Sequence, residues 1–157
     1  MTAQLIANKS FTIVAENLDN PKGLAFAPDG SLYITEAGVG GDGSSIPAPS
    51  GQGNLYYGSS GAICRIKNGT FERILTGLPS VAFPDGSGAA GPHDIKFDAD
   101  GKAYILFGYA ANPIFRESLG NSNLGTIASL ELSNNTLSSI ADITNCKAIN
   151  KIASRDN

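Results

Sequence analysis

The sequence repeats itself, and this repeat limits the folds open to the chain more than any other feature does. The segment PKGLAFAPDGSLYITEAG begins at Pro21 and aligns without gaps with PHDIKFDADGKAYILFG, which begins 71 residues later at Pro92. A second pair follows, in which GAICRIKNGTFERIL from Gly61 matches GTIASLELSNNTLSSI from Gly125 at an offset of 64 residues. The patterned segments are shared while the connections differ in length, as expected for strands joined by variable loops.

Each copy is predicted to form four short strands. Side chains alternate along the last strand of the first copy, where Phe71, Arg73 and Leu75 point one way and the residues between them the other. Asp-Gly and Asn-Gly pairs mark tight turns between strands. The predicted strands are 23–27, 31–36, 62–67 and 70–76, then 94–98, 102–107, 126–132 and 136–140, with one more strand at 11–15 ahead of both copies.

Tandem four-stranded antiparallel units are typical of β-propeller blades, so the sequence predicts an all-β partial propeller. No long 3.6-residue periodicity supports helices. A β-sandwich is the alternative, but it does not predict the repeat of a whole four-strand unit. The chain is interpreted as one domain with a leading strand in 1–20, blades at 21–76 and 77–140, and an irregular tail at 141–157.

Strand parity predicts that the connections divide between two ends of the molecule. Successive connections of an antiparallel meander alternate between the ends of the strands. The tight turns therefore share one end, and the long connections 38–60, 77–92 and 108–125 share the other. Long loops in a compact domain are usually functional. The glycine-rich stretch 38–60 is interpreted as a flexible linker rather than a phosphate cradle, because it lacks the P-loop pattern.

Composition excludes several classes of partner. Eleven basic and 14 acidic residues give a net charge of −3, which argues against binding to nucleic acid. No apolar run reaches the ~20 residues that a membrane-spanning helix needs, and the first residues do not form a signal peptide. The two cysteines, Cys64 and Cys146, form neither a disulfide framework nor a zinc site, and Cys64 is interpreted as a packed residue.

The long-loop end supplies the candidate binding residues. A ligand, either a small molecule or a protein, is expected to contact side chains in or beside the long connections. These candidates are Lys22, Asp42, Tyr56, Tyr57, Asp85 and His93.

Weaker candidates for catalysis lie at the same end. His93 is the single histidine and can act as a general base near neutral pH, with Asp94 and Glu36 as acidic partners. A structural histidine is the favoured interpretation, because Lys22 occupies the equivalent position in the first copy. No metal site and no cofactor is predicted, although calcium is the cation that an oxygen-rich set of this kind takes.

Residues 21–34 fit the P-x-G-[LI]-A-[FV]-x-x-D-G-x-[LV]-Y-[IV] pattern and resemble NHL-type six-bladed propellers. The longer segments NLDNPKGLAFAPDGSLYITEAGVGG and GLPSVAFPDGSGAAGPHDIKFDADGKAYILFGY are similar to the ScyD/ScyE family, associated with the cyanobacterial gene cluster for the pigment scytonemin. The resemblance implies a propeller scaffold, exported and linked to pigment or envelope functions, with no catalytic residues to carry over. It leaves the localisation uncertain, because this chain shows no signal peptide.

Two alternatives remain open. Residues 23–30 also resemble a segment of quinoprotein sugar dehydrogenases, and related propellers include calcium-dependent lactonases, so the resemblance allows an enzyme that uses His93, Asp94 and Glu36. ScyD/ScyE proteins are much longer than this chain, so a non-functional truncated remnant is the other interpretation. Two blades leave open edges, which predicts marginal stability or self-association, with three chains completing a ring.

Overall fold

The structure, a computed structural model, describes residues 11–49, 51–109, 111–120 and 123–143. These residues form two antiparallel sheets and one short 3₁₀ helix, η1 (Pro113–Leu119). The first sheet contains β1 (Pro21–Phe26), β2 (Leu32–Glu36), β4 (Asn54–Lys67) and β5 (Thr70–Ala82), with the short β3 (Ser45–Pro47) paired to β4. The second sheet contains β6 (Pro92–Phe97), β7 (Ala103–Phe107), β8 (Thr126–Glu131) and β9 (Thr136–Asp142).

The eight strands predicted for the two copies are confirmed, and the main difference is length. β4 and β5 extend well past the predicted segments into the long connections. The strand predicted at 11–15 is wrong, because residues 11–18 form no strand and Phe11 and Val14 are 86% and 65% exposed. A strand requires a neighbour that accepts its backbone hydrogen bonds, and residue alternation alone does not supply one.

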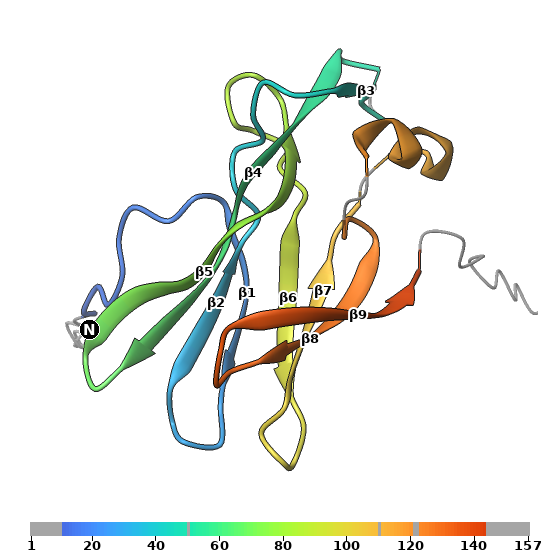
Figure 1. The fold of residues 1–157 in the computed structure, drawn as a ribbon. Coiled ribbons are helices and arrows are strands. Elements are labelled where there is room, and N and C mark those ends of the chain that lie inside the picture. Colours follow the sequence, from blue (N-terminus) through green and yellow to red (C-terminus); the bar gives the residue numbers. More distant parts are fainter. Residues whose placement is uncertain (1–10, 50, 110, 121–122, 144–157) are drawn as a thin grey trace, which may run out of the picture.

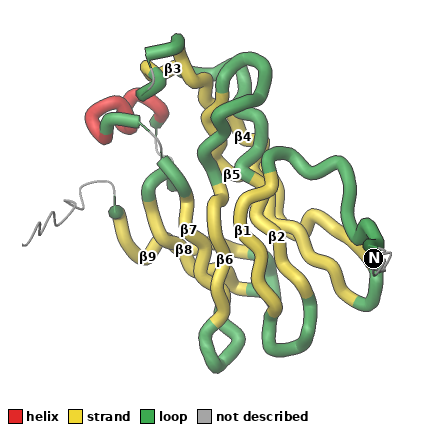
Figure 2. The backbone as a smooth tube through the Cα atoms, turned by 180° about the vertical axis from the view of Figure 1, so that it is seen from behind, coloured by secondary structure: helices red, strands yellow, loops and turns green. Residues whose placement is uncertain are grey.

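Each sheet is a meander, and the two meanders meet through their first strands. The strands run in the order β1-β2-β4-β5 in one sheet and β6-β7-β8-β9 in the other. Figure 2 shows β1 and β6 side by side at the centre of the molecule. Gly23 permits this approach, because a Cβ there would lie 2.7 Å from the Cα of Asp94. The fold is therefore an open, all-β arrangement of two propeller-like blades.

The main core lies between the facing surfaces of the two sheets. Alternate residues of β2 and β4, including Tyr33 and Ile63, pack against Ile95, Ile105 and other alternate residues of the second sheet. The Tyr33 ring meets the Phe97 ring edge to face, with 5.0 Å between their centroids. Ten buried residues form this core: Ala27, Tyr33, Ile63, Leu78, Ile95, Ala103, Ile105, Phe107, Ala128 and Leu130.

The connections divide between the two ends of the sheets as strand parity predicts. The tight turns after β1, β4, β6 and β8 lie at the lower end in Figure 1, and the long connections lie at the upper end. We call the described residues of segments 38–60, 77–91 and 108–125 the crown. It contains β3, the upper parts of β4 and β5, and η1.

Replacing the buried Ile105 with alanine tests the core between the sheets. Ile105 is fully buried, so Ile105→Ala is expected to lower the free energy of unfolding by about 2–5 kcal/mol. Ile114 is 72% exposed, so Ile114→Ala is expected to change the free energy of unfolding by less than about 0.5 kcal/mol. Chemical denaturation of both variants measures the difference, and equal effects would contradict the packing described here.

Candidate functional site

The crown has an apolar core of its own, separate from the core between the sheets. Segments far apart in the sequence contribute to it, from β3 to the loop that precedes β8. Its buried residues are Ile46, Ala48, Leu55, Val81, Ala90, Leu119 and Leu124. The aromatic rings of Tyr57, Phe83, Tyr109 and Phe115 pack around them. Three connections that could each be mobile alone are thereby held as one unit.

The interpretation of 38–60 as a flexible linker is wrong. Residues 45–47 and 54–60 belong to strands, and the preceding turn packs backbone to backbone on β4. A Cβ on Gly58 would lie 2.2 Å from the carbonyl oxygen of Gly40 and 2.6 Å from the amide nitrogen of Gly41. These glycines therefore allow the backbone of the turn at 40–41 to pack directly on the backbone of β4.

Polar side chains fix the crown to the sheet beneath it. The Ser80 hydroxyl donates to the Ala37 carbonyl at 2.6 Å and accepts from the Gly40 amide at 3.0 Å. The Asn20 side-chain amide donates to the carbonyl of Gly38 at 2.8 Å and to that of Gly86 at 2.9 Å. Asn20 thus holds the turn 83–88 close to the end of β2.

Asp85 lines a shallow depression of about 390 Å³ on this turn. The other lining residues are Gln52, Phe83, Pro84 and Ser87. The backbone amide of Ser87 donates to the Asp85 carboxylate at 2.9 Å. Hydrogen bonds from Ser87 hold the pKa of Asp85 below its usual value, so the depression carries a fixed negative charge beside an aromatic ring.

Lys22 and His93 occupy equivalent, exposed positions on β1 and β6, the two strands that lie side by side. The His93 ring lies against Gly108, where an added Cβ would be 3.2 Å from Nδ1. The register of β6 against β7 shifts between Pro92 and Asp94, so His93 is an extra residue at a bulge and strand alternation does not decide where Asp94 points relative to it. The Asp94 carboxylate accepts from the Ile95 amide at 2.9 Å and from Lys96 Nζ at 3.0 Å.

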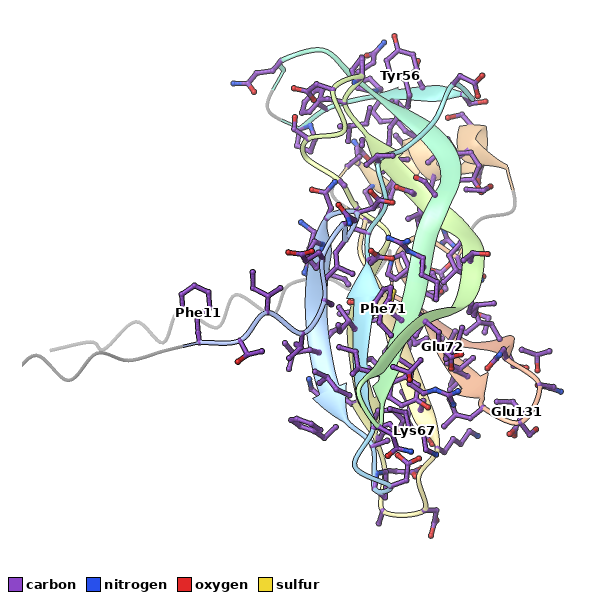
Figure 3. The ribbon with its side chains drawn as sticks, turned by 90° about the vertical axis from the view of Figure 1, so that its left-hand side faces the viewer. Phe11, Tyr56, Lys67, Phe71, Glu72 and Glu131 are labelled. Carbon is purple, nitrogen blue, oxygen red and sulfur yellow. The ribbon has the colours of Figure 1, made fainter. Side chains whose placement is uncertain are left out.

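The remaining binding candidates lie on the crown. Tyr56 and Tyr57 are half-buried on β4, and Tyr57 packs against the crown core. Figure 3 shows Tyr56 at the top of the molecule. Tyr56 pairs in register with Ala82, directly before the turn that carries Asp85, and Asp42 is exposed on the turn that packs on β4.

Glu36 has a different environment from the one expected for a catalytic acid. Its side chain is fully buried at the end of β2. Oε1 accepts from the Asp19 amide at 2.8 Å and from Arg73 Nη2 at 3.0 Å, while Oε2 accepts from Arg73 Nε at 2.7 Å and from Cys64 Sγ at 3.1 Å. Four donors occupy the acceptor positions of the carboxylate, so Glu36 connects β2 with β4, with β5 and with the segment before β1.

These contacts set the charge state of the cluster. Burial alone would raise the pKa of Glu36, but hydrogen bonds from Arg73, Cys64 and Asp19 and the Arg73 charge outweigh it and lower the pKa. Burial, together with the neighbouring Glu36 charge, raises the pKa of Cys64 to about 12. Cys64 is therefore a neutral thiol that donates a hydrogen bond, in agreement with a packed residue and not a nucleophile.

No group of three or more histidine, cysteine, aspartate or glutamate side chains is placed to hold a metal ion within residues 11–49, 51–109, 111–120 and 123–143. Over the same ranges, no helix has the length and apolar character required to cross a membrane. Cys146 and the rest of the predicted tail from residue 144 lie outside the described residues, as do residues 1–10.

Sequence reasoning missed Arg73, and it missed the contacts through which Asn20 holds this end of the molecule together. The repeat contained one usable signal, because Glu36 aligns with Phe107 in the second copy. A carboxylate at a position where the other copy has a core aromatic residue predicts a buried partner of opposite charge. Asn20 carried no comparable signal, since its contacts depend on where Gly86 lies in space.

Comparisons with known proteins give limited guidance. No protein-family profile matches the chain, and no curated protein matches it. A solved structure from Thermus thermophilus, described as a candidate oxidoreductase (glucose dehydrogenase), is 23% identical with a TM-score of 0.35. The match covers 74% of this chain and 46% of that protein, so this chain spans less than half of its length. A likeness of this extent carries no argument about activity.

The Glu36 cluster predicts a specific dependence of stability on pH. A lowered pKa in the folded state stabilises the protein above the unfolded value of about 4.3, and this contribution disappears as pH falls through the folded pKa. Glu36→Gln is expected to lower the free energy of unfolding by about 1–3 kcal/mol at pH 7. The loss is smaller than for breaking a fully buried ion pair, because Arg73 is 35% exposed. The deficit should shrink below about pH 4.

Denaturation of wild type and Glu36→Gln from pH 7 to pH 3 measures this effect, with Glu117→Gln as the control on the exposed side of η1. A deficit of the same size at every pH would show that the carboxylate charge contributes nothing to the stability of the fold.

Gly58→Ala tests the backbone contact within the crown. The added methyl group would overlap the Gly40 carbonyl, so the crown must shift, at a cost of about 1–3 kcal/mol. Hydrogen exchange should accelerate at amides of the crown and stay unchanged in β6 and β7. Ser59→Ala, at the exposed neighbouring position, is the control, and unchanged exchange in Gly58→Ala would refute the contact.

Proposed function

We propose that the chain is a binding module that recognises a small-molecule or protein ligand through its crown. The observation that carries this proposal is the crown core, which joins three long connections into one ordered surface. Binding residues lie disproportionately on loops that a rigid scaffold positions, and a pre-organised surface gains affinity because less ordering is needed on binding. Within the described part of the chain, the strand connections at the opposite end are all tight turns.

The chemistry of the crown fits recognition of a ligand with polar and ring-like groups. The depression beside Asp85 combines a charged carboxylate, the ring of Phe83 and the hydroxyl of Ser87. Tyr56 lies on the adjoining strand, and Lys22 and His93 add exposed groups at the centre of the molecule. Aromatic side chains with a few placed polar groups are typical of ligand sites.

The resemblance to the ScyD/ScyE family supports the scaffold part of the proposal and a role connected with scytonemin or with the cell envelope. The motif of residues 21–34 and the crown segments 38–41 and 77–91 carry that resemblance. The enzyme alternative, with calcium or quinone as cofactor, retains His93 and Asp94. Glu36 is a weaker candidate in this alternative, because its carboxylate already accepts four hydrogen bonds.

Ligand-observed NMR with a library of sugars, aromatic acids and short peptides tests the proposal. Tyr56→Ala and Asp85→Asn are expected to weaken binding of any hit by about tenfold or more, because each removes a contact at the crown. Asp100→Asn, in a tight turn at the opposite end, is the matched control. Hits that respond equally to all three variants would contradict recognition through the crown.

A further inference from the structure

Each sheet has one surface that packs on the other sheet and one outer surface. In the described part of the chain, no further sheet packs against either outer surface. Strand register assigns Leu24, Phe26, Leu32, Ile34 and Ile66 to the surface of the first sheet that points away from the second. We call this surface the leading face.

The second sheet likewise has a surface that points away from the first. Its residues include Lys96, Tyr104, Leu106, Ile127 and Ser129. We call this surface the trailing face.

The repeat shows that these two surfaces are complementary. The leading face is equivalent to the buried surface of the second sheet, because Leu24 aligns with Ile95 and Phe26 with Phe97. The trailing face is equivalent to the buried surface of the first sheet, because Tyr104 aligns with Tyr33. The described residues therefore contain one interface between the two sheets and a second set of the same two surfaces that no other described strand pairs.

Exposure differs sharply between the equivalent positions. Ile95 is 1% exposed, whereas its equivalent Leu24 is 60% exposed and Phe26 is 69% exposed. Ile13 and Val14, 61% and 65% exposed, line a hollow together with Phe71 at the border of the leading face. Four of the eight large apolar side chains exposed in the described residues thus gather at this surface, as expected for an interaction site.

We propose that the leading face binds the trailing face of a second copy of this chain. The contact repeats the interface between the two sheets, so Phe26 of one copy packs edge-on against Tyr104 of the next, as Phe97 packs against Tyr33 within the chain. The pairing is head to tail, and successive copies close into a ring if the rotation between them allows it.

The Glu36 cluster limits where this contact lies. Near the crown, Glu36 and Arg73 bind residues 17 and 19, which cover that part of the leading face. The equivalent of Glu36 in the second sheet is the buried Phe107, so the crown side of the face has lost the apolar character of its counterpart. The contact is therefore made by the part nearer to the tight turns, around Phe26 and Leu32.

Sedimentation analysis of the 157-residue chain over a wide concentration range is the test. The wild type should assemble reversibly. Phe26→Glu and Tyr104→Glu each place an unpaired charge in the contact and should raise the dissociation constant by about 100-fold or more. Ile114→Glu is the control, because Ile114 is equally exposed but lies on η1, away from both faces.

Mixing the two blocked variants distinguishes head-to-tail pairing from a symmetric dimer. Each variant alone should be monomeric, and an equimolar mixture should form a 1:1 complex through the one intact pair of faces. Self-association of either variant alone, or a mixture without complex, would overturn the pairing. A wild-type chain that stays monomeric would overturn it as well and would assign the leading face to another partner or another part of the chain.

Circular dichroism and thermal unfolding confirm that each variant is folded before it is analysed. Leu24→Lys and Ile127→Lys block the same two faces and replace any variant that fails this check.

Discussion

The whole fold depends on the contact between the two sheets. Each sheet is only four or five strands wide, and neither can bury its apolar side chains without the other. The contact forms because strand alternation puts Tyr33 and Ile63 on one side of the first sheet and Ile95 and Ile105 on the facing side of the second. The absence of a side chain at Gly23 then lets β1 and β6 come together at the centre.

The two copies differ in sequence where the crown begins, and this difference makes the two ends of the first sheet chemically unlike. Phe107 is a core residue in the second sheet, whereas its equivalent Glu36 is a buried charge held by Arg73. A buried carboxylate is costly unless its acceptor positions are satisfied, and the contacts of residues 17 and 19 complete the hydrogen bonds of the Glu36–Arg73 pair. The first sheet therefore ends in a polar cluster at the crown and in an apolar surface near its tight turns.

Much of the fold could be predicted from the sequence, because its signals are local. Turn pairs such as Asp29-Gly30 and alternation within each strand specify the strands, and parity specifies which connections share an end. The segment 11–15 has the same alternation but lacks a neighbouring strand, and only the tertiary structure reveals that. The role of the crown glycines is hidden from local patterns for a similar reason, because Gly58 packs against Gly40, which lies 18 residues away in the sequence.

The candidate site was less predictable than the strands. Parity placed Tyr56 and Asp85 at the correct end of the molecule, but the depression beside Asp85 depends on the fixed position of its turn. Strand order alone places Glu36 at an open surface, because it says nothing about Arg73, which reaches Glu36 from another strand. Contacts between distant side chains decide which polar residues are available to a ligand, and one sequence contains little information about them.

The central claim is that the two repeated sheets pack face to face through equivalent surfaces, and the rings of Tyr33 and Phe97 test it most directly. Their centroids lie 5.0 Å apart in an edge-to-face arrangement, so their protons should give strong nuclear Overhauser cross-peaks in solution. Cross-peaks between these rings would support the account. Their absence, in a spectrum that still shows the cross-strand contacts within each sheet, would mean that the sheets form but do not pack as described.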